Sequence, residues 1–320
     1  MENLQHKMSL ENSAKIILKD CMALKNNESC LVVTDSKLKP IGNIIYKTAL
    51  KISKNSKLIF TNIPKTHGAE PPADIAKEML KYNVVLLATA KSLSHTKSRE
   101  NASKKGARIA SMPSITIDMM KRALNVNFYK IKELNKKLIS KLKGKNNIRI
   151  ITKKGTDAEF YLKGRKWVSD DGIYTKKRTF GNLPAGEIFI APLEYKTNGV
   201  IISDANIDKN RRIENIKIEI KDGFISKIEG GRISNKFKKL LKYKLYKNVA
   251  ELGIGTNYKA KITGNILEDE KVSGTCHIAF GNNKHFGGKV DVPFHRDFVI
   301  KNPTIYADDV LIMKYGRFNF

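Results

Sequence analysis

The stretch Cys30-Leu31-Val32-Val33-Thr34 decides the fold class, because a short apolar run without alternation is typical of a strand buried on both faces. Asp35-Ser36 ends this run with two polar residues. Apolar residues at helical spacing precede it within residues 10–24, and a second helix is predicted over residues 41–52. A buried strand between two helices is the repeating unit of a parallel sheet.

The same alternation continues to about residue 113. Further strands are predicted over residues 57–62, 84–89 and 107–111, with a helix that opens at Pro71-Pro72 and another near residues 101–105. Four such strands separated by helices predict a parallel sheet with helices on both faces. The following residues, 117–145, are helical in pattern and rich in lysine, which favours a solvated helix between two domains.

The hydrophobic period changes from residue 147 onward. Residues 148–152 and 158–162 alternate at period two, and Lys221-Asp222-Gly223-Phe224 is a hairpin turn signal between isoleucine-rich segments. The predicted fold class is therefore α/β. A parallel-sheet α/β domain over residues 1–145 is followed by an α+β, mainly antiparallel domain over residues 146–320.

The composition is that of a water-soluble protein: 320 residues, of which 41% are hydrophobic and 28% charged. No apolar run approaches the roughly 20 residues of a membrane helix, and the N-terminus lacks the apolar core of a signal peptide. Three cysteines are too few for a disulfide framework. We expect a cytoplasmic protein with no membrane partner.

The formal net charge of +29 raises nucleic acid as a partner. However, 49 of the 60 basic residues are lysines spread along the whole chain, and only 11 are arginines. Lysine coats solvated faces, whereas arginine makes bidentate phosphate contacts. The pattern favours a solvated surface, and a basic nucleic-acid-binding protein is kept as a third hypothesis.

Three of the six histidines, His277, His285 and His295, cluster near the C-terminus. In His295-Arg296-Asp297 the imidazole and the carboxylate stand at i and i+2, so in a strand they project from the same face. His277 lies in a second strand-like run and can supply a third ligand. Two histidines and one aspartate match a facial-triad iron site or half of a two-metal site. The simpler alternative is a surface histidine beside an aspartate.

Two glutamates stand in apolar surroundings. Glu187 follows a Pro/Gly turn at the head of an apolar strand, and Glu251 lies within another apolar run. Carboxylates in such places need a cation, which is either a metal ion or one of the many lysines.

Three further motifs have structural interpretations. Cys276 is predicted to point to the opposite face from His277 as a small buried residue. Gly253-x-Gly255 lacks the rest of a phosphate loop and is interpreted as a tight turn at a strand end. Ser94-His95-Thr96 is interpreted as a helix-capping turn rather than a substrate contact.

Four ordered motifs carry a family resemblance: NLPAGEIFxAP from Asn182, ELGIGTN from Glu251, ILEDEKVxGTCHIAFG from Ile266 and HRD from His295. Together they resemble the metal-dependent aminopeptidase T / aminopeptidase S family, also called leucyl aminopeptidase. The resemblance implies a homodimer that removes N-terminal residues from short peptides. It also implies two divalent ions, Zn, Co or Mn, held by Glu187, Glu251, His277, His295 and Asp297.

One feature departs from that family, whose aminopeptidases carry a tyrosine shortly after the first metal histidine. Here that stretch is Gly281-Asn282-Asn283-Lys284-His285-Phe286-Gly287-Gly288, without tyrosine, so Lys284 or His285 takes the polar role or the chemistry has changed. A related branch is the mononuclear Fe(II) dioxygenase of the dihydroxypyridine type, which uses two histidines and one aspartate. In that alternative His277, His295 and Asp297 bind iron, and the glutamates support them or act as a base.

The sequence-based hypothesis is the two-metal aminopeptidase, because five ligand-type residues are more than one iron requires. Two ions sharing a water would lower its pKa towards neutrality and polarise the scissile carbonyl. Glu187 or Glu251 would act as general base, and His285 is a candidate for stabilising the oxyanion or the leaving group.

Overall fold

The computed structural model describes residues 2–207 and 213–320. The chain divides into two compact units, one made of Met1–Lys132 with Asp170–Ala185 and the other of Glu133–Ser169 with Gly186–Phe320. This division differs from the boundary predicted at residues 145 and 146. Most of the basic helix α6 (Phe128–Leu142) belongs to the second unit, because Leu138 and Leu142 enter its core.

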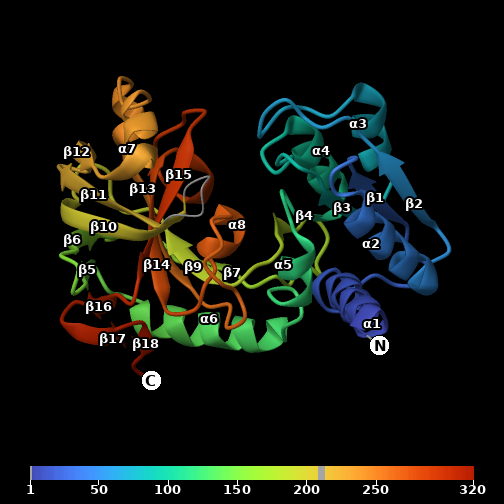
Figure 1. The fold of residues 1–320 in the computed structure, drawn as a ribbon, viewed down its shortest axis with the longest axis horizontal. Coiled ribbons are helices and arrows are strands. Elements are labelled where there is room, and N and C mark those ends of the chain that lie inside the picture. Colours follow the sequence, from blue (N-terminus) through green and yellow to red (C-terminus); the bar gives the residue numbers. More distant parts are fainter. Residues whose placement is uncertain (1, 208–212) are drawn as a thin grey trace. The chain divides into compact units, whose positions relative to one another are not determined.

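The first unit is built on a five-stranded sheet in the order β2-β1-β3-β4-β8, in which every pairing of neighbours is parallel (Figure 1). Its strands are β1 (Cys30–Thr34), β2 (Ser56–Phe60), β3 (Val84–Ala88), β4 (Arg108–Ser111) and β8 (Phe180–Asn182). The predicted α/β class and its four strands are confirmed. The fifth strand, β8, was not predicted, because only three half-buried residues form it, far along the chain from β4.

The helices of the first unit follow the predicted alternation. They are α1 (Glu2–Lys15) with the π-helical turn η1 (Ile16–Cys21), α2 (Lys39–Ile52), α3 (Ala73–Met79), α4 (Lys97–Lys105) and α5 (Ile117–Lys121). The helix predicted over residues 10–24 begins earlier, at Glu2. The sequence pattern did not indicate the first turns, because they are polar and carry no apolar period. Thr96 accepts a hydrogen bond from the Arg99 amide at the start of α4, so the predicted helix-capping turn is confirmed.

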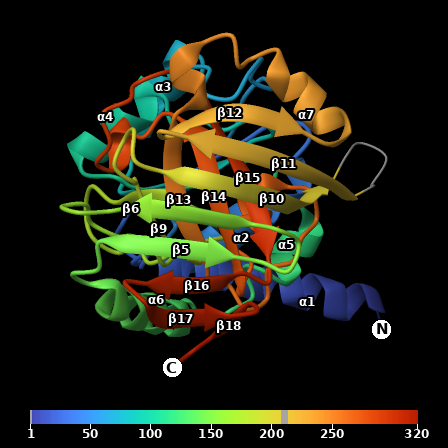
Figure 2. The same ribbon diagram turned by 90° about the vertical axis from the view of Figure 1, so that its left-hand side faces the viewer.

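The second unit contains two sheets. Neighbours in the eight-stranded sheet, β12-β11-β10-β6-β5-β16-β17-β18, are all antiparallel, and the five-stranded sheet has the order β15-β14-β13-β9-β7 (Figure 2). The strands are β5 (Asn147–Ile151), β6 (Asp157–Tyr161), β7 (Val168–Asp170), β9 (Glu187–Ile190), β10 (Asn198–Ile207), β11 (Ile213–Lys221), β12 (Phe224–Glu229), β13 (Val249–Gly255), β14 (Thr275–Gly281), β15 (His295–Lys301), β16 (Thr304–Ala307), β17 (Val310–Lys314) and β18 (Arg317–Phe318).

Short helices complete this unit: α7 (Gly231–Lys238), α8 (Ile266–Asp269) and the 3₁₀ turns η2 (Lys244–Lys247) and η3 (Lys284–Phe286). The predicted hairpin joins β11 to β12, and its central residues Asp222 and Gly223 both have positive φ, as a tight two-residue turn requires. Isoleucines of β5, β10 and β11 share one core with the apolar face of β13 and β14. The predicted mainly antiparallel architecture is confirmed.

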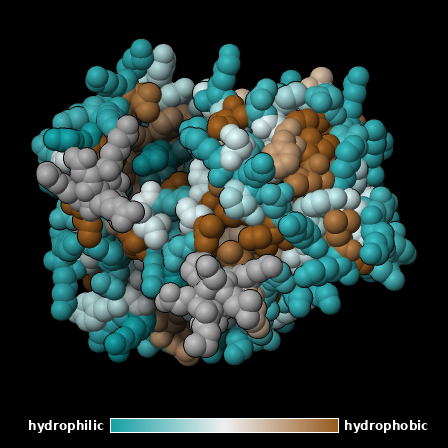
Figure 3. All heavy atoms as spheres, turned by 45° about the vertical axis from the view of Figure 1, so that its right-hand side comes forward, coloured by the Kyte–Doolittle hydropathy of each residue, from teal (hydrophilic) through white to brown (hydrophobic). Residues whose placement is uncertain are grey.

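Within the described residues, the helices are all too short or too polar to span a lipid bilayer. The face drawn in Figure 3 is mainly hydrophilic, with hydrophobic side chains in separate patches. Cys21, Cys30 and Cys276 are buried free thiols.

Candidate metal centre

All five predicted ligands lie on neighbouring strands of the five-stranded sheet of the second unit, β15-β14-β13-β9-β7. Glu187 opens β9, Glu251 lies in β13, His277 in β14, and His295 and Asp297 in β15. The register places Glu251 opposite Ala279 and Ala279 opposite Asp297, which puts these side chains on one face. Alternate residues of the same strands, such as Ile254, Ile278 and Phe298, fill the core on the other face.

The ligand atoms approach one another closely. Nε2 of His277 lies 3.2 Å from Oε1 of Glu251 and 3.3 Å from Oε2 of Glu187. Nε2 of His295 lies 3.5 Å from Oε2 of Glu251 and 3.4 Å from Oδ1 of Asp297. Glu251 therefore faces both imidazoles, and Glu187, Glu251 and His277 offer ligand atoms that all lie within 4.8 Å of one another.

Glycine makes room for the imidazole of His277. A Cβ atom added at Gly253, which pairs with His277 across the ladder, would lie 2.1 Å from Cε1 and 2.2 Å from Nε2 of that ring. The ring thus lies directly over the backbone of β13. The interpretation of Gly253-x-Gly255 as a tight turn is wrong for Gly253, which lies inside the strand and lets the imidazole approach it.

Cys276 precedes His277 on β14 and is fully buried in the core, on the face away from the cluster. Burial raises the pKa of its thiol well above the usual value. The prediction of a small buried residue is confirmed.

Surrounding groups orient the ligands. Nδ1 of His295 lies 2.9 Å from the carbonyl oxygen of Asn282, so a proton on Nδ1 leaves Nε2 free to face Glu251 and Asp297. The Phe286 ring meets His295 edge-on, with 6.1 Å between ring centroids. Asn135 of α6 donates a hydrogen bond of 2.8 Å to the carbonyl of Glu187 and accepts one of 2.7 Å from Thr256, which fixes the start of β9 beside the end of β13.

The negative charges of neighbouring carboxylates determine the pKa values of His277 and His295. Burial alone would lower them, but neighbouring carboxylates outweigh burial and raise the pKa of His277 to about 9 and that of His295 to about 10. Burial would raise the pKa of Asp297, yet the charge of His295 lowers it far below the usual range.

Glu187 behaves differently from Asp297. Burial raises the pKa of its carboxyl to about 8, although the charges of Lys271 and His277 oppose this. Nζ of Lys271, a residue that is 2% exposed, makes an ion pair with Oε1 of Glu187 and a second one of 2.8 Å with Oε1 of Glu270. The sequence left open whether Glu187 pairs with a metal ion or with a lysine. In the structure it pairs with Lys271 and also lies beside His277.

Sequence reasoning missed Lys271 and Glu270 as parts of this cluster. The available signal was the charged run of residues 268–271 just before the strand of His277. Such a run is normally solvated, and only the return of the chain after α8 brings it inside.

His285 directly precedes Phe286, whose ring meets His295 edge-on. It is an exposed residue of η3, and its charge acts on Asp291. The loop that carries His285 is held by Glu194, which pairs with the half-buried Arg165 and accepts hydrogen bonds from the Lys289 amide and the Asn283 side chain.

The donor set suits a divalent cation. Three carboxylates and the imidazole of His277 are buried, where uncompensated negative charge is costly, and the imidazole of His295 beside them is 33% exposed. Oε2 of Glu187 is buried and accepts no hydrogen bond within the described part of the chain, so it is available as a ligand. Mixed carboxylate and imidazole donors fit iron, zinc, cobalt and manganese.

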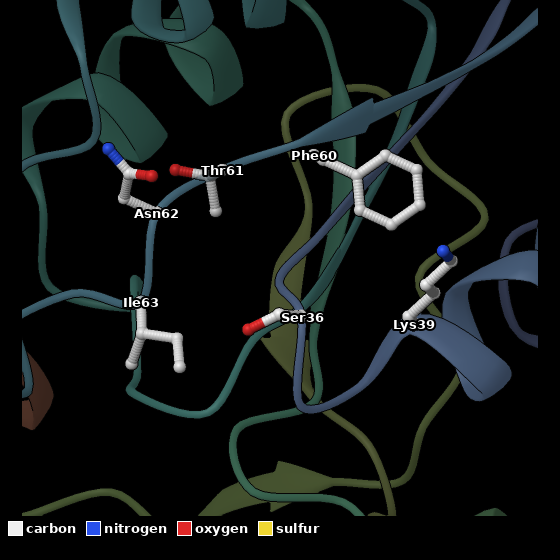
Figure 4. A pocket seen from close by; sticks show the side chains of 6 residues that line it. All are labelled: Ser36, Lys39, Phe60, Thr61, Asn62 and Ile63. Atoms are coloured by element: carbon white, nitrogen blue, oxygen red, sulfur yellow. The ribbon is translucent and has the colours of Figure 1, made fainter.

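An open pocket of the first unit is lined by other residue types than the carboxylate and imidazole cluster. It is lined by Ser36, Lys39, Phe60, Thr61, Asn62 and Ile63, beyond the ends of β1 and β2 (Figure 4). Its lining holds no carboxylate or imidazole, so it offers none of the donor groups found in the cluster of the second unit.

A mixed α/β fold with this cluster defines a metal-binding enzyme. The chain belongs to the 2,5-dihydroxypyridine 5,6-dioxygenase family, whose sequence model matches residues 36–319. It is 28% identical over 193 residues to the 2,5-dihydroxypyridine 5,6-dioxygenase of Pseudomonas putida KT2440, and the match spans 55% of each protein. This is the branch that the sequence analysis held as the alternative.

Two solved structures share the fold. The 2,5-dihydroxypyridine dioxygenase from Pseudomonas putida KT2440 has a TM-score of 0.81 at 20% identity, covering 100% of this chain and 98% of the other. Wild-type AmpT from Thermus thermophilus has a TM-score of 0.73 at 14% identity, covering 98% of this chain and 100% of the other. The likeness to the aminopeptidase is therefore one of fold.

Proposed function

We propose that this protein is a mononuclear Fe(II) dioxygenase that opens the ring of a dihydroxylated pyridine. The observation that carries the proposal is that Glu251 faces the imidazoles of both His277 and His295, with Asp297 beside His295, in a member of this family. His277, His295 and Asp297 would hold the iron, and Glu251, which faces both imidazoles, is a further candidate donor or base.

Bound iron(II) would bring dioxygen and a ring hydroxyl together on one centre. The residues of the chain supply the rest. The Asn282 carbonyl keeps His295 in the tautomer whose Nε2 faces the cluster, and the carboxylate of Glu251, which lies beside both imidazoles, would accept the hydroxyl proton of the substrate. Phe189 and Phe286, whose rings meet edge-on at 5.4 Å, form an apolar wall beside His295 that suits a planar heteroaromatic ring.

The reaction needs no external reductant, because both oxygen atoms of O₂ enter the ring-opened product. The test is oxygen uptake by protein loaded anaerobically with Fe(II) and mixed with 2,5-dihydroxypyridine. We expect one O₂ consumed per ring lost. His295→Ala and Asp297→Ala should abolish uptake, whereas Asp157→Ala, which removes an exposed aspartate paired with Arg149, should not. Equal uptake by all three variants would contradict the site assignment.

The aminopeptidase is a second candidate, favoured by one observation: Glu187 and Glu251 join the histidines, which gives more donors than a facial triad needs. In this alternative two Zn, Co or Mn ions would activate a water against short peptides, with one glutamate as base. Release of amino acids by Zn- or Co-loaded protein, without oxygen uptake under Fe(II), would select it. Oxygen uptake without peptide hydrolysis would exclude it.

A further inference from the structure

Lys271 is a cation built into the candidate metal centre. It follows α8, and its backbone is fixed on both sides, since its amide donates to the Glu268 carbonyl and its own carbonyl accepts from the Asn257 amide. The side chain is 2% exposed, which is rare for lysine unless it is paired. Its ammonium group therefore has a fixed place rather than a solvated range of positions.

The ammonium group lies between two carboxylates. It pairs with Oε1 of Glu187 and, at 2.8 Å, with Oε1 of Glu270. The other oxygen of Glu187, Oε2, lies 3.3 Å from Nε2 of His277. Glu187 is thus shared between a cation on one side and the imidazole on the other.

The charge balance distinguishes one ion from two. Once a metal has displaced their protons, the imidazoles are neutral and Glu187, Glu251, Glu270 and Asp297 carry four negative charges, of which Lys271 offsets one and leaves three. One divalent ion brings the sum to minus one. A second ion would make it plus one in a buried place and would face the ammonium group directly, which is unfavourable without solvent.

We infer that Lys271 occupies the place of a second cation beside Glu187 and Glu270, and so keeps the centre mononuclear. The inference concerns the same cluster as the proposed function and rests on it only in assuming that this cluster binds a divalent metal. It predicts that the lysine, rather than the number of donors, sets the metal content.

The test is metal content at saturation, measured with Co(II) by elemental analysis after removal of free metal. Wild-type protein should hold one ion per chain. Lys271→Met, which keeps most of the side-chain volume without the charge, should hold two, and Lys271→Arg should return to one. Arg108→Met is the matched control, since it removes a buried cation from Glu28 in the first unit, and it should hold one.

Two ions per wild-type chain would overturn the inference, as would one ion per chain in a folded Lys271→Met protein. If that variant does not fold, Mn(II) titration of the wild-type protein decides the matter. A paramagnetic signal that saturates at one equivalent supports the inference, and a spin-coupled pair overturns it. A protein with one ion per chain but no oxygen uptake would refute the proposed function and leave this inference standing.

Discussion

Gly253→Ala tests whether the position of the His277 imidazole over β13 is needed for metal binding. The added methyl would lie 2.2 Å from Nε2, whereas ordinary van der Waals contact begins at 3.4 Å. The ring must withdraw by more than about 1 Å, and metal–ligand distances tolerate only about 0.2 Å. We expect affinity for Co(II) to fall at least about 100-fold, which corresponds to about 2.7 kcal/mol.

The assay is competition with a chromophoric chelator, with thermal unfolding of the metal-free protein measured in parallel. An off-rotamer histidine costs about 1 kcal/mol, so the unfolding midpoint should change by only a few degrees. Gly144→Ala is the control: its added methyl meets nothing within 4 Å, although its positive φ adds some strain. Unchanged metal affinity in Gly253→Ala would refute the assignment of His277 as a ligand.

Three further predictions concern protons, packing and assembly. Metal affinity should rise between pH 7 and pH 9, because the metal-free cluster holds protons on His277 (pKa about 9) and His295 (pKa about 10) that the metal must displace; calorimetry in two buffers of different ionisation enthalpy would show proton release, and its absence would contradict these pKa values. Arg165→Met should lower the free energy of unfolding by about 1–3 kcal/mol, because it leaves the half-buried carboxylate of Glu194 without its cation; urea denaturation measures this, and the double variant with Glu194→Gln should recover most of the loss. The homodimer implied by the family resemblance stays a prediction, and light scattering should give about twice 36.1 kDa; a mass of one chain would contradict it.

Most of the fold could be predicted from the sequence, because the patterns that indicate its helices, strands and turns are local. The apolar run Cys30–Thr34 and the Asp222-Gly223 turn each determine their own backbone, and the structure has them where they were predicted. The strand β8 could not be predicted, because its three residues gain their place only by pairing with β4.

The candidate site was predictable only where it depends on local spacing. The i and i+2 spacing of His295 and Asp297 holds on any strand, so their shared face followed from local geometry. The pairing of Lys271 with Glu187 depends on a contact between residues 84 positions apart, which no periodicity encodes. The role of Gly253 likewise depends on the register between β13 and β14.

Oxygen uptake is the decisive measurement for the proposed ring-opening dioxygenase. Protein loaded with one Fe(II) per chain should consume one O₂ for each 2,5-dihydroxypyridine ring that it opens, and uptake should stop when Fe(II) is removed by a chelator. A protein that opens no such ring and consumes no oxygen, but releases amino acids from peptides when loaded with zinc or cobalt, would contradict the account.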